Sequence, residues 1–198
     1  MLKWLSQVDE TDANLHYSSL ALNCFSTARK ESSLGMKLFI TKWLSGDTAT
    51  GKIMCARKQW KINTCSRWDT ENEHLLHVIV CPAQQASTLM DSMISELLQW
   101  LRDVHTHPCI ISFIRLGLPK WITNRTFKWS QNSSIFSDCS TVNSAIVSQL
   151  EIGWYYFLCG MLATELVDLQ QSYYTQIGSK RSSNRWATNL LRNFGVFT

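Results

Sequence analysis

The chain contains 198 residues, of which 45% are hydrophobic and 17% charged, and its formal net charge at pH 7 is +4. This composition excludes an intrinsically disordered chain, and the length is enough for one domain or two small lobes. The longest apolar run, residues 152–163, is shorter than the roughly 20 residues of a membrane-spanning helix. Because the first residues also lack the apolar run of a signal peptide, we expect an intracellular protein, cytoplasmic or nuclear, with no membrane partner.

Apolar residues recur at helical spacing along the chain, and no segment alternates as a β-strand does. After a polar terminus at residues 1–12, this spacing predicts helices over 14–29, 34–44, 48–60 and 71–80, the last ended by Cys81-Pro82. The clearest amphipathic stripe covers residues 89–101. An apolar helix over 110–121 is expected to be interrupted at Gly117-Leu-Pro119, and His105 and His107 are expected in solvent at a helix end.

Residues 123–141 are rich in Asn, Ser and Thr, which is typical of a linker. Beyond them, helical spacing continues from residue 146 to 173, and a final helix carries Trp186 and Phe194. We therefore predict an all-α fold, an irregular helical bundle with a long C-terminal helix. Its regions are residues 13–122, including a knuckle-like loop near 63–82, and residues 142–198, with a basic end. The nine tryptophans are expected to pack in the core.

The segment from Gly46 to Lys52 fits the G-x-x-x-x-G-K pattern of a phosphate-binding loop. The next residue of such a loop supplies a hydroxyl to magnesium, but here it is Ile53. The preceding segment also has helical rather than strand spacing. We interpret the two glycines as a helix end followed by the cap of the next helix, with Thr48 as the capping residue.

Seven cysteines in a chain without an export signal favour reduced thiols or metal ligands over disulfides. Cys65, His77 and Cys81 fit the zinc pattern C-x2-C-x8-H-x3-C, except that Trp68 replaces the second cysteine. His74 could complete a four-ligand set, because residues 74, 77 and 81 share a helix face, and Cys55 is another candidate. Alternatively the site has decayed to packed thiols. A hydrolytic three-ligand site with Glu73 as its base is a further alternative.

Two basic stretches contain no acidic residue, one between Lys52 and Arg67 and one after Asp168. Such stretches suit contact with the phosphates of RNA or DNA, although solvated helix faces also carry Lys and Arg. The residues expected to contact nucleic acid are Arg57, Lys58, Lys61, Arg67, Lys180, Arg181 and Arg185. We find no nucleophile–base pattern and no paired carboxylates at catalytic spacing, so we expect neither an enzyme nor a small-molecule substrate.

Three stretches, residues 41–52, 65–82 and 149–192, together resemble the region downstream of the polymerase in reverse-transcriptase-bearing mobile elements of unicellular eukaryotes. The last stretch includes Ile152-Gly-Trp154 and the run from Ile177 to Ala187. In those proteins a zinc knuckle precedes a helical tail, and Cys65, His77 and Cys81 match the knuckle, with zinc as the implied cofactor. The resemblance covers most of residues 40–192 and implies a severed piece of such an element, without its polymerase.

Two functions follow as hypotheses. In the first, the chain is a non-catalytic mobile-element fragment that binds nucleic acid through its basic stretches and its zinc knuckle. In the second, the chain is a protein-interaction module or an unselected remnant, whose tryptophan-rich helices only pack. Basic residues gathered on one face would favour the first hypothesis, and scattered ones the second.

Overall fold

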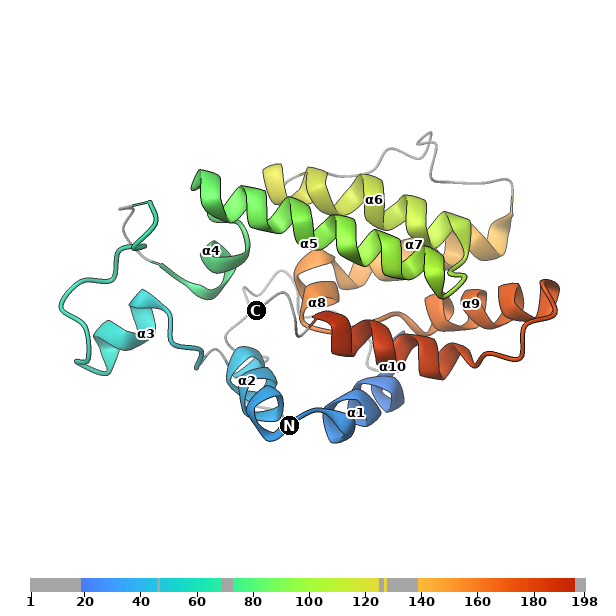
Figure 1. Ribbon diagram of the computed structural model, residues 1–198, viewed down its shortest axis with the longest axis horizontal. Helices are drawn as coiled ribbons and strands as arrows, with labels where there is room; N and C mark the ends of the chain where they lie inside the picture. The colour runs from blue at the N-terminus through green and yellow to red at the C-terminus, as the bar shows by residue number, and fades with distance from the viewer. Residues whose placement is uncertain (1–18, 46, 69–72, 125–126, 128–138, 195–198) are drawn as a thin grey trace.

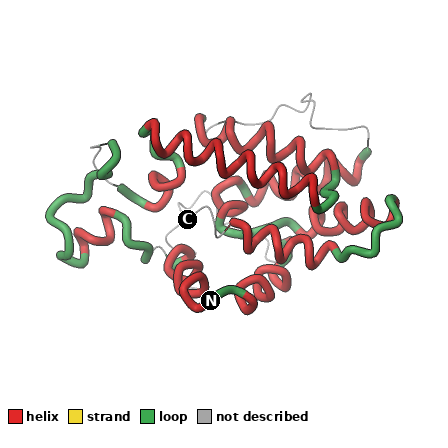
Figure 2. Tube along the Cα trace, viewed as in Figure 1, coloured by secondary structure: helices red, strands yellow, loops and turns green. Residues whose placement is uncertain are grey.

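The computed structural model describes residues 19–45, 47–68, 73–124, 127 and 139–194. Within these residues the chain forms ten helices and no β-strand, which confirms the all-α prediction (Figures 1 and 2). None of the described helices is both long and apolar enough to cross a bilayer. The predicted terminus at 1–12 and most of the predicted linker at 123–141 lie outside the described residues.

The helices follow one another in the order shown in Figure 1. They are α1 Leu22–Glu31, α2 Leu34–Leu44, α3 Gly51–Ala56, α4 Leu75–Ile79, α5 Gln84–Asp103, α6 Pro108–Thr123, α7 Ser140–Ile152, α8 Trp154–Leu158, α9 Thr164–Gln176 and α10 Ser183–Phe194.

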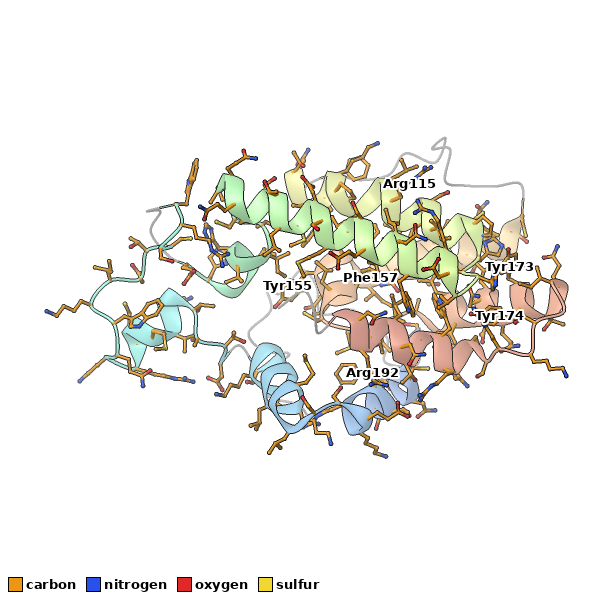
Figure 3. The ribbon with its side chains drawn as sticks, viewed as in Figure 1. Arg115, Tyr155, Phe157, Tyr173, Tyr174 and Arg192 are labelled. Atoms are coloured by element: carbon orange, nitrogen blue, oxygen red, sulfur yellow. The ribbon has the colours of Figure 1, made fainter. Side chains whose placement is uncertain are left out.

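A single large hydrophobic core joins α1 with α5 to α10. Its centre is aromatic: the rings of Phe113 and Trp154 stack with centroids 4.5 Å apart, and Phe157 meets Trp154 edge-on at 5.4 Å. Figure 3 shows Phe157 in the middle of the bundle. Trp121 and Trp186 are also buried in this core, as expected from the tryptophan content.

Helix α1 packs along α10, so the two predicted regions, 13–122 and 142–198, share one core. The Glu31 carboxylate accepts hydrogen bonds from Arg185, at 2.7 and 2.8 Å, and from Arg192 at 3.3 Å. Arg192 is labelled in Figure 3, where α10 meets α1. The ion pairs therefore fasten an N-terminal helix to the last described one.

The stretch from 146 to 173 is not one long helix, which corrects the prediction. Gly153 and Gly160 have φ angles of 89° and 88°, a left-handed conformation that breaks the chain into α7, α8 and α9. The side chain of Gln149, which is 1% exposed, binds the backbone at the second break, between α8 and α9. Its side chain donates to the Met161 carbonyl at 3.2 Å and accepts from the Ala163 amide at 2.9 Å.

Helix α6 runs through the Gly117-Leu-Pro119 sequence without the predicted interruption. Proline removes one amide donor from the helix, but Gly117 and Leu118 are buried, and Leu118 is fully enclosed by the core. Packing therefore outweighs the local preference of proline for a helix end.

Candidate metal centre and basic loop

Helices α3 and α4 and the loop between them lie at one end of the molecule, on the left in Figure 1. Hydrogen bonds to Glu73 hold this lobe together, one of them from the Lys52 amide to the Glu73 carbonyl at 3.0 Å. Glu73 accepts from the Gly51 amide through Oε2 at 2.7 Å, and its own amide donates to the Asn63 carbonyl at 2.8 Å. A Cβ atom at Gly51 would lie 2.7 Å from the Asn63 oxygen, so this close approach requires glycine.

In the segment that fits the phosphate-binding pattern, residues 46–52, Gly51 therefore serves the start of a helix. Helix α3 begins at Gly51, and its N-cap is Thr50 rather than the expected Thr48. The Gly51 amide, which would face a phosphate in a nucleotide-binding loop, is bound by the Glu73 carboxylate. Glu73 therefore caps a helix, and it is not among the residues of the metal-ligand group described below.

The loop that follows α3 brings Cys65 inward. Cys65 is 2% exposed, and its carbonyl accepts a hydrogen bond from the Trp68 amide at 3.3 Å, which closes a turn. The Trp68 side chain is 50% exposed. The turn has the form that a Cys-x-x-Cys pair would use, but only its first residue can coordinate a metal.

Helix α4 presents the other two residues of the group. It spans Leu75–Ile79, shorter than the predicted 71–80, and Cys81 follows its C-cap residue, Val80. His74 is the N-cap: its Nδ1 atom accepts from the His77 amide at 3.2 Å. His74 is therefore committed to the helix start and does not join the group, contrary to its expected role as fourth ligand.

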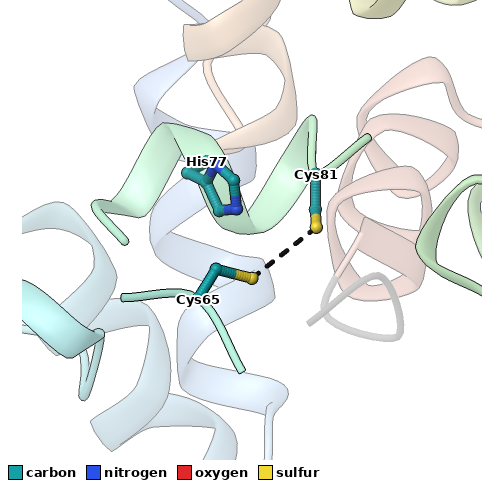
Figure 4. Close-up of side chains that lie close together, drawn as sticks. All are labelled: Cys65, His77 and Cys81. Carbon is teal, nitrogen blue, oxygen red and sulfur yellow. Dashed lines mark hydrogen bonds between the residues drawn. The ribbon is translucent and has the colours of Figure 1, made fainter. Parts of the chain in front are cut away.

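The buried thiols of Cys65 and Cys81 and the half-buried His77 converge in one small group, shown in Figure 4. One potential ligand atom from each lies within 4.8 Å of the other two, and the two Sγ atoms are 3.7 Å apart. The Nε2 atom of His77 is buried and has no hydrogen-bond partner among the described residues. Two thiols and an unsatisfied imidazole nitrogen at this spacing could hold a metal ion.

Burial raises the pKa of the Cys81 thiol, because a thiolate there loses contact with water, and the nearby Cys65 adds to the effect. The positive charge of Arg67 opposes this shift. A bound cation would act in the same direction as Arg67 but more strongly, since a coordinating thiol is deprotonated outright. Cys55, the alternative ligand, is half-buried in α3 and lies outside the group.

The lobe has almost no hydrophobic core of its own. The second buried cluster consists of Cys65, Cys81 and Ala83, with Ala86 packed against it. Four small side chains bury little apolar area, and two of them belong to the candidate metal centre. Small folding units of this kind usually depend on a metal or a disulfide for stability.

The loop at residues 57–68, hereafter the basic loop, exposes its cations. Arg57 pairs with Asp47 at 3.4 Å. Lys58, Lys61 and Arg67 are exposed, and no ion pair is found for them among the described residues. Trp60 is also exposed, at 46%, as is Trp68. Sequence reasoning placed all the tryptophans in the core, so it missed these two surface rings.

The second basic stretch lies at the opposite end of the molecule, in the connection between α9 and α10, near Tyr173 and Tyr174 in Figure 3. Lys180 is exposed there, and Arg181 donates to the Asp103 carbonyl at 3.4 Å. Arg185 is occupied by its ion pair with Glu31. The structure thus does not gather the expected nucleic-acid contacts on one face, and this separation by itself favours the second hypothesis. Within the basic loop, Arg57, Lys58, Lys61 and Arg67 are all exposed.

Comparison of the chain with protein-family models, with curated proteins and with solved structures finds no match.

Proposed function

We propose that the chain is a non-catalytic, nucleic-acid-binding part of a reverse-transcriptase-bearing mobile-element protein. In this proposal, zinc held by Cys65, His77 and Cys81 fixes the basic loop. The observation that carries it is the position of Cys65: the residue belongs to the basic loop and is buried against His77 and Cys81. A metal at this point fastens the loop while leaving its cations in solvent.

The spacing of the group suits zinc. Tetrahedral zinc with Zn–S bonds of about 2.3 Å separates two sulfur ligands by about 3.8 Å. The Cys65 and Cys81 sulfurs are 3.7 Å apart, and coordination through Nε2 would satisfy the buried His77 nitrogen. Two thiols and an imidazole favour zinc over calcium or magnesium, which prefer oxygen ligands. The fourth ligand would come from outside this group. Zinc here would serve as a structural link between loop and helix.

Nucleic-acid binding is supported by the charge of the loop. No acidic residue occurs from residue 48 to residue 68, and the cations of the basic loop are exposed. Phosphate contacts made by such cations release counterions, so binding weakens steeply with salt and shows little sequence preference. The α9–α10 connection, with Lys180 and Arg181, would form a separate contact at the other end of a long nucleic acid.

Metal content and salt dependence test the proposal together. We expect about one zinc per chain in the purified protein by mass spectrometry, and none after Cys81→Ser.

The salt dependence of binding is measured by fluorescence anisotropy with a labelled oligonucleotide. Lys58→Gln with Lys61→Gln should lower the slope of log affinity against log salt concentration by about 1.4, at roughly 0.7 per contact with a single strand. Lys180→Gln with Arg181→Gln tests the second contact in the same way. Binding that does not depend on salt would contradict the proposal.

Two exposed leucines of α2 favour the second candidate function, a protein-interaction module. Leu34 and Leu38 are four positions apart on the helix and are 73% and 54% exposed, so together they present apolar surface that a partner could cover. Oligonucleotide binding by the unchanged chain separates the two functions, because an interaction module that lacks nucleic-acid binding would bind none. Leu38→Glu is the matched surface control: under our proposal it leaves oligonucleotide affinity unchanged.

A further inference from the structure

The tryptophans whose side chains the structure describes differ widely in exposure, with Trp100 between the extremes. Trp121, Trp154 and Trp186 are between 3% and 9% exposed, as large aromatic rings in a core usually are. Trp60 and Trp68, by contrast, are 46% and 50% exposed, and both belong to the basic loop. Leaving two indole rings in water gives up the free energy that their burial would contribute, so these two positions call for a separate explanation.

The exposed rings alternate with exposed cations. Within twelve residues of irregular backbone the chain presents, in order, Arg57, Lys58, Trp60, Lys61, Arg67 and Trp68. A nucleotide offers the same alternation, because each negatively charged phosphate is followed by a base with a flat π-face. Proteins that bind single strands without strong sequence preference combine these two elements, a cationic track and aromatic rings on which bases stack.

We propose that Trp60 and Trp68 form a stacking site for the unpaired bases of a single-stranded nucleic acid. In this site Lys58, Lys61 and Arg67 contact the phosphates on either side. The inference rests on the proposed function, since it assigns a ligand class to the same loop. It goes further, because phosphate contacts alone do not distinguish a single strand from a duplex.

The shape of the loop favours a single strand over a duplex. Bases in a duplex are stacked on one another and present only their edges, and the major groove is read by an inserted helix or β-ribbon. Residues 57–68 form neither element in the structure. A turn closed by Cys65 and Trp68 presents the second ring at the point where the loop is anchored to the metal centre. The anchored ring would then need little ordering when a base stacks on it.

The same surface fits a protein partner less well. Its apolar part consists of the two rings and Ile62, which is 67% exposed, and Lys61 and Arg67 lie between these residues in the sequence. A partner for this surface would have to be acidic as well as apolar. Binding of an acidic peptide, with no binding of oligonucleotides, would overturn both this inference and the proposed function.

The test compares oligonucleotides that carry the same phosphates but different bases. We would measure anisotropy with the zinc-loaded full chain on three labelled probes: a short oligothymidine, an abasic strand of equal length, and a hairpin duplex. We expect the wild-type chain to bind oligothymidine about 10-fold more tightly than the abasic strand. Trp60→Ala with Trp68→Ala should remove this difference and leave affinity for the abasic strand and the duplex unchanged.

Two further variants keep the test decisive. Trp60→Phe with Trp68→Phe retains stacking surfaces and should preserve most of the preference for oligothymidine, and Ile62→Ala, an exposed apolar change in the same loop, should have no effect. Equal binding of oligothymidine and the abasic strand by the wild-type chain would overturn the stacking site. Salt-dependent binding of all probes would then still support the proposed function, whereas no binding to any probe would remove both.

Discussion

The Sγ atom of Cys65 lies 3.7 Å from the Sγ atom of Cys81, although 16 positions separate the two residues in the chain. The two thiols belong to different parts of the lobe. Cys65 is in the basic loop, whereas Cys81 follows α4 and its C-cap Val80. Leu76, Ile79 and Val80 are half-buried against the main core, so this contact joins the loop to a segment that touches that core.

Trp68→Cys should strengthen metal binding. The Trp68 amide already closes a turn with Cys65, so a thiol at position 68 would stand where a Cys-x-x-Cys pair places its second ligand. We expect the affinity for zinc, measured by competition with a chromogenic chelator, to rise by about 10-fold or more. Trp68→Ser is the matched control, since it removes the indole without adding a ligand. Equal affinities for the two variants would show that the turn cannot deliver a fourth ligand.

Removing the metal should release the basic loop while α4 stays in place. In hydrogen exchange, we expect chelator to increase the exchange rates of the amides of Trp68 and Glu73, because the turn and the Asn63 contact lose their anchor. Amides in α5 to α10 should keep their protection. Cys65→Ser should show the fast exchange even in the presence of zinc. Uniform loss of protection throughout the chain would contradict this division.

Gln149→Leu should destabilise the bundle strongly. The buried amide of Gln149 satisfies the Met161 carbonyl and the Ala163 amide at the break between α8 and α9. Leucine leaves both backbone groups buried without a partner, at about 1–3 kcal/mol each, so we expect the free energy of unfolding to fall by about 3 kcal/mol. The control Gln176→Leu, at an exposed position of α9, should change it by less than about 0.5 kcal/mol. Urea denaturation measures both.

Stability should decrease in mild acid through His107. Burial lowers the pKa of His107, and its Nδ1 atom accepts from the Cys109 amide at 3.1 Å as the N-cap of α6. It is half-buried, not solvated as expected from the sequence. A lowered pKa means that the unfolded chain binds the proton more readily. The stability that neutral His107 contributes is therefore complete above the ordinary pKa of about 6.5. It is lost as the pH falls towards the lowered pKa of the folded state.

The measurement is the free energy of unfolding as a function of pH, compared with that of His107→Asn. Asparagine caps helices well and does not titrate, so the variant should lose stability less steeply below about pH 6.5. Parallel curves for the two proteins would show that other groups cause the decrease.

Local spacing was enough to predict several helices. The apolar positions from residue 34 to 44 predict a helix with the same bounds as α2, and the stripe over 89–101 lies within α5. Both segments are defined by side chains three and four residues apart, which sequence shows directly. The sequence does not show that Gly153 and Gly160 end helices, because a glycine within helical spacing can continue the helix or end it. At Gly160 a tertiary contact explains the need for glycine: a Cβ atom would lie 3.2 Å from the Phe25 ring of α1.

The candidate site was predictable to a similar extent. Cys65, His77 and Cys81 were identified by their spacing, and the structure brings them together. His74 was misjudged, because α4 begins after it and a residue at a helix start does not share the side-chain direction of the helix. The exposure of Trp60 and Trp68 depends on how few residues pack around the loop, which composition does not report.

The pairing of α1 with α10 has a consequence for synthesis on the ribosome. Glu31 and Arg185 are 154 positions apart, and Cys24 meets Asn184 across 160. Helix α1 is synthesised before α10, the helix against which it packs most extensively, and α10 follows many seconds later at an elongation rate of about 5–20 residues per second. During that interval its apolar side, including Phe25, is open to chaperones or to other nascent chains. We therefore expect folding to be completed only when α10 has left the exit tunnel, and truncations before residue 183 to aggregate.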